Sequence, residues 1–345
     1  MKADLIEKQK EYLSRMLSKK RVMVSGSTGL IGSRIVRYLL TLNDTYDAGI
    51  TVTALYRNEE KRAKLYPEQR SDLTFLTYTE ERGVEKDVPV DYIMHAAGIS
   101  GGSKMHLKDP VKIFTTGIDG TKLLLDYAAK NGCERFCYAS TYEIYGDAGS
   151  DGLIAEDQAC SLNTMVLRNS YAEVKRVCES MLTAYSAAYG IKVFAGRLTS
   201  TFGTGVAYGD PRFFAEFCRC AIEGRDIVMK STGGTVRSYL DSDDAASAFL
   251  YILVNGENEN AYNLTNPENE ISVKGIAERM IALIGDGIEL KMEIAEDAQA
   301  LGFRKESRTV MDAGKLMGLG WAPAYSLDDT IRKMYESMKD NKDAD

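Results

Sequence analysis

Residues 21–42 read RVMVSGSTGLIGSRIVRYLLTL and decide the fold. A short β-rich run at 21–25 predicts a strand, Gly26, Gly29 and Gly32 follow at intervals of three, and residues 31–42 carry apolar side chains at helical spacing. A strand, a glycine turn and a helix N-terminus together present backbone N–H groups and a positive dipole end to a pyrophosphate. The stretch therefore predicts a dinucleotide cradle, and the alternative is a glycine turn that binds no ligand.

The same alternation of strands and helices continues along the chain. Further strands are expected at 50–56, 73–78, 90–95, 136–140 and 192–198, and helices at 111–130 and 170–189. This order predicts an α/β fold with a doubly wound, Rossmann-type parallel sheet. Beyond residue 198 the pattern is less regular, with helices expected at 213–223, 243–254, 273–284 and 327–338. We therefore expect a smaller C-terminal substrate-binding lobe.

These patterns also predict how the chain divides. Residues 1–20 carry apolar side chains near helical spacing, which indicates an amphipathic helix ahead of the first strand. We expect the cofactor-binding domain to be formed by 21–199 and 237–264, and the substrate-binding lobe by 200–236 and 265–345.

Composition excludes several classes of function. The 345 residues carry a formal charge of −7, which disfavours nucleic acid as a partner. No apolar run is long enough for a bilayer, so we expect a cytoplasmic protein without a membrane partner. The six cysteines lack the spacing of a zinc site, which predicts that they are reduced residues with a packing role. The sequence has only two histidines, which disfavours a histidine-based metal centre and a serine–histidine hydrolase. No metal is expected.

Tyr171 and Lys175 are the first candidates for chemistry. They lie four residues apart in the helix expected at 170–189, so both side chains share one face. A tyrosine is a poor base at neutral pH, but a neighbouring lysine cation favours its phenolate form. Tyr171 could then accept a hydroxyl proton. Taken alone, the same pattern could be a chance pair on a helix.

The strand end about thirty residues upstream supplies the context, because residues 138–146 read YASTYEIYG. With the glycine spacing and the Tyr171–Lys175 pair, this resembles the extended short-chain dehydrogenase/reductases, in particular the NAD-dependent epimerase/dehydratase family that acts on nucleotide sugars. The resemblance covers nearly the whole chain, through GRL at 196–198, FG at 202–203, RSYL at 237–240, DD at 243–244 and LGW at 319–321.

The resemblance implies the site residues. The implied catalytic residues are Thr141, Tyr171, Lys175 and Glu143. The implied cofactor contacts are Gly26, Thr28, Gly29, Leu30, Ile31, Gly32, Arg57, Ala96, Ala97, Gly98, Tyr171 and Lys175. The implied substrate contacts are Thr141, Tyr142, Ser200 and Arg237. The resemblance also implies a nucleotide-diphosphate sugar as substrate and a homodimer formed through helices 111–130 and 170–189.

The resemblance implies NAD as the cofactor. The residues at the end of the second strand leave NADP as an alternative. An acidic residue there normally binds the ribose hydroxyls, whereas an arginine accommodates a 2′-phosphate. Residues 54–58 read ALYRN and contain no acid. Arg57 could stack on adenine or pair with a phosphate, or it could be an ordinary solvated charge.

Departures from the family pattern bear on the substrate. Gly117 stands where the family usually has asparagine, Ser200 where asparagine often helps to hold the substrate phosphate, and Asp241 where histidine is frequent. None of them removes a group that oxidation of a sugar carbon requires.

The expected reaction begins with oxidation at sugar C4. Glu143 resembles the glutamate of hexose 4,6-dehydratases and glucuronate decarboxylases, which implies a second stage of decarboxylation or elimination. Tyr142 stands where one class of dehydratases has an aspartic acid, so the UDP-glucuronate decarboxylases are the nearer match. The alternatives are a 4-epimerase, an NADPH-dependent ketone reductase and a catalytically silent cofactor-binding protein.

Overall fold

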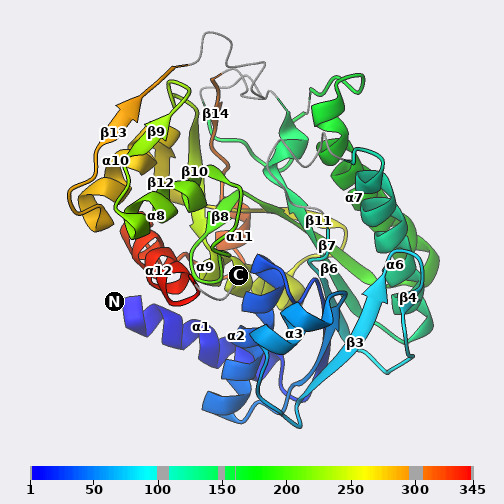
Figure 1. Cartoon of the computed structure of the whole chain (residues 1–345). Coiled ribbons are helices and arrows are strands. Elements are labelled where there is room, and N and C mark those ends of the chain that lie inside the picture. The colour runs from blue at the N-terminus through cyan, green and yellow to red at the C-terminus, as the bar shows by residue number, and fades with distance from the viewer. Residues whose placement is uncertain (1, 99–108, 147–151, 160, 295–305, 343–345) are drawn as a thin grey trace.

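The computed structural model describes residues 2–98, 109–146, 152–159, 161–294 and 306–342 (Figure 1). Its largest sheet has eight strands in the order β11-β7-β6-β5-β1-β2-β3-β4. All neighbours pair in parallel except β3 and β4. The bounds are β1 Arg21–Ser25, β2 Thr51–Tyr56, β3 Leu73–Thr79, β4 Gly83–Val84, β5 Tyr92–His95, β6 Arg135–Thr141, β7 Lys192–Leu198 and β11 Asn260–Leu264. The predicted doubly wound α/β fold is confirmed.

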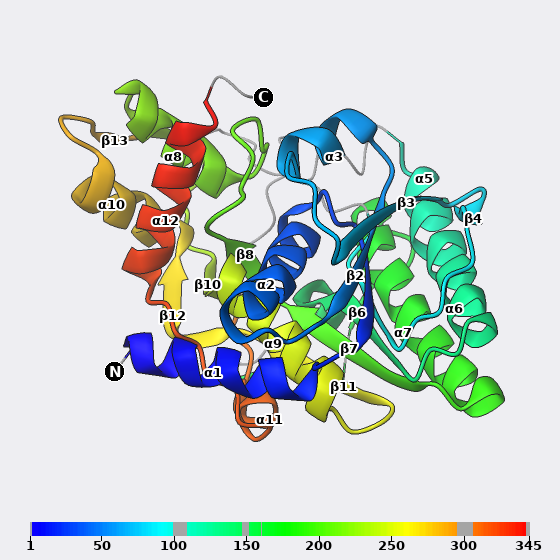
Figure 2. The same ribbon diagram turned by 90° about the horizontal axis from the view of Figure 1, so that it is seen from below.

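Helices cover both faces of this sheet (Figure 2). One layer contains α1 (Lys2–Met16), α2 (Leu30–Tyr46) and α9 (Ser242–Asn255), and the other contains α6 (Gly120–Lys130) and α7 (Ser170–Tyr189). Strand β1 shows how the sequence divides between the layers. Its Val22 and Val24 pack into the first layer and Met23 into the second, because successive strand residues face opposite sides.

The helix expected at 111–130 is interrupted. It consists of α5 (Lys112–Phe114), a π-helical turn (Thr115–Asp119) and α6. Within the turn, a Cβ added to Gly117 would lie 2.3 Å from Cγ1 of Val174 on α7. The missing side chain lets the turn lie against α7, and the helix predicted at 111–130 is present with this π-helical turn inside it.

A smaller lobe follows β7 in the chain. Its central strand β10 pairs with β12, β14 and β8, and a separate pair joins β13 to β9. The bounds are β8 Ser200–Phe202, β9 Ile227–Met229, β10 Val236–Asp241, β12 Asn266–Ser272, β13 Leu290–Met292, β14 Arg308–Thr309, α8 Phe213–Glu223, α10 Val273–Ile284 and α12 Leu327–Asp340. Strand β10 thus pairs in the second sheet, while α9 and β11 join the first. The exact division into two domains stays a prediction.

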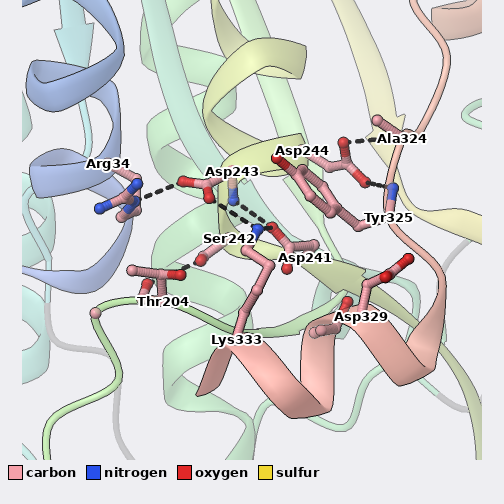
Figure 3. A network of polar contacts seen from close by, with 12 residues as sticks. Arg34, Thr204, Asp241, Ser242, Asp243, Asp244, Ala324, Tyr325, Asp329 and Lys333 are labelled. Atoms are coloured by element: carbon pink, nitrogen blue, oxygen red, sulfur yellow. Dashed lines mark hydrogen bonds and ion pairs between the residues drawn. The ribbon is translucent and has the colours of Figure 1, made fainter. Parts of the chain in front are cut away.

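A buried charge network links α2, α9 and α12 (Figure 3). Asp241 ends β10, is fully buried and accepts a hydrogen bond from the backbone N–H of Asp243. Lys333 of α12 lies 2.6 Å from Asp241 and 2.8 Å from Asp243, and Arg34 of α2 donates to Asp243 at 2.6 Å. The two carboxylates therefore receive their counterions from opposite ends of the chain.

The described cysteines are all buried and unpaired, as a packing role predicts, and Cys160 lies outside the described residues. None of the helices in the described ranges combines the length and apolar character that a bilayer crossing requires. Across the same ranges, His, Cys, Asp and Glu side chains form no group of three or more that could hold a metal ion.

Candidate active site

One large cavity, of about 1690 Å³, lies beyond the carboxyl ends of β1, β2, β5 and β6 and extends into the smaller lobe. In open parallel sheets this edge is where ligands bind. Every residue that the sequence assigned to the site lines this cavity: Gly26, Thr28, Gly29, Leu30, Ile31, Gly32, Arg57, Ala96, Ala97, Gly98, Thr141, Tyr142, Glu143, Tyr171, Lys175, Ser200 and Arg237.

The glycine turn forms the floor of the cavity below the N-terminus of α2. Gly26 has φ +68°, and a Cβ there would lie 2.7 Å from the backbone nitrogen of Ala97. A Cβ on Gly32 would lie only 2.2 Å from the carbonyl oxygen of Gly26. Gly29 caps α2 and donates its N–H to that same oxygen at 2.9 Å. The turn closes only without side chains, which fits a cradle for a pyrophosphate.

The end of β2 gives the cavity a cationic corner. Arg57 is 60% exposed, and its only ion pair in the described ranges is a 3.6 Å contact with Glu80. Glu80, at the end of β3, also accepts a hydrogen bond from Thr116. Lys61 lines the same corner, in the helix α3 (Glu59–Leu65) that Asn58 caps. This corner could receive a ribose or a ribose phosphate.

His95 joins strands and helix beneath the cavity. Its Nδ1 lies 2.6 Å from Oγ of Ser25 and its Nε2 lies 3.0 Å from Oγ1 of Thr121. Burial, with a smaller contribution from the charge of Lys175, lowers the pKa of His95 to about 3. The ring is therefore neutral and both nitrogens are engaged, which agrees with a structural role.

Thr141, Tyr171 and Lys175 meet where β6 ends against α7. The side chains of Thr141 and Tyr171 are hydrogen-bonded to each other. The ammonium of Lys175 donates to the carbonyl oxygen of Ala139 at 2.6 Å and lies 5.9 Å from the centre of the Tyr171 ring. Burial raises the pKa of Tyr171 and lowers that of Lys175 to about 8. In the protein alone, the phenol therefore keeps its proton.

Glu143 has a partner that sequence reasoning missed. It lies in the 3-10 turn Tyr142–Tyr145, which Thr141 caps. Arg168, in the 3-10 turn Leu167–Asn169, reaches both of its carboxylate oxygens, with Nη1 2.9 Å from Oε2 and Nη2 3.3 Å from Oε1. Arg168 also lines the cavity. The one signal in the sequence is an arginine three residues before Tyr171.

Arg237 faces the same space from β10. Its guanidinium carbon lies 5.2 Å from the centre of the Tyr142 ring, and its Nε is buried without a hydrogen-bond partner. The alternative of a salt bridge to Asp243 or Asp244 does not hold, because Asp243 pairs with Arg34 and Lys333, and Asp244 accepts backbone N–H groups from residues 324 and 325. Arg237 is thus available to an anion in the cavity.

A Rossmann-type sheet whose first glycine turn shares one cavity with a Tyr-x-x-x-Lys helix defines a dinucleotide-binding protein of the short-chain dehydrogenase/reductase type. Residues 22–265 match the NAD dependent epimerase/dehydratase family, and the chain belongs to that family.

Individual relatives show the same relationship over nearly the full length. The chain is 27% identical to the low-salt glycan biosynthesis protein Agl12 of Haloferax volcanii, over 90% of this chain and 96% of that protein. It is 27% identical to UDP-glucuronic acid decarboxylase 5 of Arabidopsis thaliana, over 93% of this chain and 90% of that protein. The crystal structure of UDP-glucuronic acid 4-epimerase from Bacillus cereus with UDP-glucuronic acid and NAD is similar in fold, with TM-score 0.77, 19% identity, and coverage of 93% of this chain and 99% of that one.

Proposed function

We propose that this protein binds NAD and uses it to oxidise C4 of a nucleotide-diphosphate sugar, after which the sugar undergoes decarboxylation or elimination. The observation that carries the proposal is the convergence of Thr141, Tyr171, Lys175 and Glu143 in the cavity that the glycine turn floors. The family to which the chain belongs is NAD dependent, and the turn fits a pyrophosphate.

The residues divide the first stage among them. NAD, when bound, would accept hydride from sugar C4. Tyr171 would take the proton of the C4 hydroxyl, Thr141 would orient that hydroxyl through its own, and the charge of Lys175 would favour the phenolate. Cofactor contacts would come from the glycine turn (Gly26, Thr28, Gly29, Leu30, Ile31, Gly32), the corner at Arg57, the small residues Ala96, Ala97 and Gly98, and Tyr171 and Lys175.

The C4 ketone makes the second stage possible, because it stabilises an electron pair left on C5. In decarboxylation the C5–C6 bond breaks, carbon dioxide leaves, and C5 takes up a proton. In elimination C5 loses a proton, the C6–O bond breaks, and the hydroxyl leaves as water after gaining a proton. The hydride would then return from the reduced cofactor, to C6 after elimination, as C5 takes up a proton, and to C4 after decarboxylation when the product is an alcohol. Glu143 would exchange the proton with C5 in either case. Tyr142 offers no carboxylic acid to protonate a departing hydroxyl, which favours decarboxylation.

The substrate would be held from the smaller lobe. Arg237, whose Nε has no hydrogen-bond partner, would bind the diphosphate or a sugar carboxylate, and Ser200 and Tyr142 would line the sugar.

Three alternatives differ from this proposal in the residues that they use. A 4-epimerase would need only Thr141, Tyr171 and Lys175, and Glu143 would have no catalytic role in it. A ketone reductase using NADPH would draw on Arg57. A silent cofactor-binding protein is disfavoured because the chemical groups are all present.

Solvent deuterium separates these outcomes. Purified protein is incubated with UDP-glucuronate or UDP-glucose in D₂O, and products are identified by NMR and mass spectrometry. Carbon dioxide release, or loss of water with solvent hydrogen at C5, supports the proposal. Inversion at C4 without solvent label contradicts it in favour of an epimerase, and stoichiometric consumption of NADPH contradicts it in favour of a reductase.

We further propose that the protein is a cytoplasmic homodimer. Helix α7 packs against α6 and leaves Val177 and Tyr189 exposed, and Phe114 is exposed on α5, which also packs against α7. The buried, unpaired cysteines suit a reducing compartment. Light scattering of the purified protein tests the dimer, and a monomeric mass would contradict it.

A further inference from the structure

The ion pair between Arg168 and Glu143 joins two segments at the reacting centre. Glu143 follows Thr141 in the chain by two residues, and its backbone N–H donates to the Thr141 hydroxyl at 3.3 Å. Arg168 precedes Tyr171 by three residues, in the 3-10 turn that comes directly before α7. The pair therefore connects the strand end that bears the hydroxyl to the helix that bears the phenol.

The geometry of the pair differs from that of an ordinary surface salt bridge. Nη2 of Arg168 donates a hydrogen bond to Oε1 of Glu143 at 3.3 Å, and Nη1 lies 2.9 Å from Oε2 without forming a hydrogen bond. The two side chains are only 29% and 14% exposed, so this ion pair is less screened by solvent than a surface pair. Arg168 thus helps to hold Glu143 in the cavity.

The segment that carries Arg168 is itself held in place. Asn169 donates its side-chain N–H to the carbonyl oxygen of Asn163, and backbone bonds join Val166 to Asn163 and Asn169 to Val166. Arg168 is therefore presented to Glu143 from a compact turn. A purely structural role, with Glu143 serving only to anchor this turn, is the competing explanation.

Charges around the phenol give Arg168 a second effect. Burial is the main cause that raises the pKa of Tyr171, and the negative charge of Glu143 raises it further, with a smaller contribution from Tyr142. The hydrogen bond with Thr141 and the charge of Arg168 act in the opposite direction. Lys175 faces the same ring. Removing Arg168 would take away one of the positive charges that face Glu143, and Arg237 would remain as another.

We propose that Arg168 is a positioning residue, which holds the Glu143 carboxylate beside the Thr141–Tyr171 pair so that it meets sugar C5. Arg168 acts through Glu143 and transfers no proton itself. The inference rests on the proposed function, because it assumes a second stage in which Glu143 exchanges a proton. It adds a residue that the family resemblance did not supply.

The test compares holoenzyme variants Arg168→Gln, Arg168→Lys, Glu143→Gln and the double variant Arg168→Gln/Glu143→Gln on the nucleotide sugar that the wild type turns over. Arg168→Gln should lower kcat by about 10- to 100-fold with a smaller change in KM, because a misplacement of about 1 Å has effects of that order. Arg168→Lys should be intermediate, since it keeps the charge and loses the guanidinium hydrogen bond to Oε1 of Glu143. It also keeps the proposal testable if the glutamine variant fails to fold.

Two readouts separate positioning from a structural role. In the Glu143→Gln background, Arg168→Gln should lower kcat by no more than about twofold, because the carboxylate that it positions is gone. In the wild-type background, Arg168→Gln should shift the limb of the pH–rate profile that reports Tyr171 toward higher pH. Arg176→Gln is the matched control: Arg176 also pairs with a glutamate on α7, at 3.7 Å, but does not line the cavity.

The outcomes are distinct. An active wild type with an Arg168→Gln variant of unchanged kcat and pH profile overturns the inference alone. An equal loss with and without Glu143 also overturns it, in favour of the structural explanation. A wild type that turns over no nucleotide sugar overturns the proposed function and this inference with it.

Discussion

A substitution at Gly117 tests directly how α7, the helix that carries Tyr171 and Lys175, packs against the π-helical turn. Gly117→Ala would place a Cβ 2.3 Å from Cγ1 of Val174, which lies between those two residues on α7. Ordinary contacts between carbon atoms are about 3.5–4.0 Å, so one of the helices must shift by about 1 Å. Val174 is 2% exposed and β-branched, and has little freedom to give way.

The expected effect on stability has two opposing parts. Overpacking of this kind costs about 1–3 kcal/mol, whereas replacing a helical glycine by alanine gains about 0.5–1 kcal/mol. Gly117 does not have a positive φ, so the gain applies. Gly117→Ala alone should lower the free energy of unfolding by about 1–2 kcal/mol. In a Val174→Ala background the clash is absent, and the same substitution should be neutral or stabilising.

Urea denaturation of the wild type, both single variants and the double variant measures whether the effect of Gly117→Ala on the free energy of unfolding changes sign in the Val174→Ala background. Gly209→Ala is the control, because an added Cβ there meets nothing within 4 Å, and its effect should stay within about 0.5 kcal/mol. If the effects of Gly117→Ala and Val174→Ala add to within about 0.5 kcal/mol, the close contact does not exist and the reasoning is refuted.

Three further predictions concern the site. Tyr171→Phe should abolish turnover while NAD binding, followed by calorimetry, stays near the wild-type value; undiminished turnover would remove the phenol from the mechanism. Gly32→Ala should weaken NAD binding at least about tenfold, because its Cβ would lie 2.2 Å from the Gly26 oxygen, and an unchanged affinity would contradict the cradle. Burial lowers the pKa of Lys175 from 10.5 to about 8, so between these pH values the unfolded chain binds a proton that the folded protein lacks. The free energy of unfolding of the wild type should therefore rise with pH across this window relative to Lys175→Met, by roughly 1–3 kcal/mol in urea titrations; a constant difference would argue against a buried ammonium.

Local signals explain which elements the sequence predicts well. Strand β1 is a compact apolar run that ends at a glycine with positive φ, and its expected bounds agree with the structure. Helix α10 begins where predicted because Ser272 caps it, with its side chain accepting the N–H of Gly275. In both cases the signal lies within a few residues of the boundary it sets.

The remaining features depend on contacts between distant segments. Within the π-helical turn Gly117 lies against Val174, and a residue pattern along one helix does not contain that contact. The Arg168–Glu143 pair likewise joins positions from separate turns, and Arg168 alone resembles any charged residue in a loop. The placement of β10 in the second sheet follows from its partners β8, β12 and β14, which its own sequence does not specify.

The network of Arg34, Asp243 and Lys333 has a mechanical consequence (Figure 3). Helix α2 starts at the glycine turn, and Arg34, one helical turn later, is connected through Asp243 to Lys333 of α12. The start of the helix that follows the glycine turn is thereby tied to the smaller lobe. A neutral side chain at position 333 would leave the fully buried Asp241 carboxylate without its counterion, whereas Asp243 would keep Arg34, and the junction between α2 and α12 would be weakened.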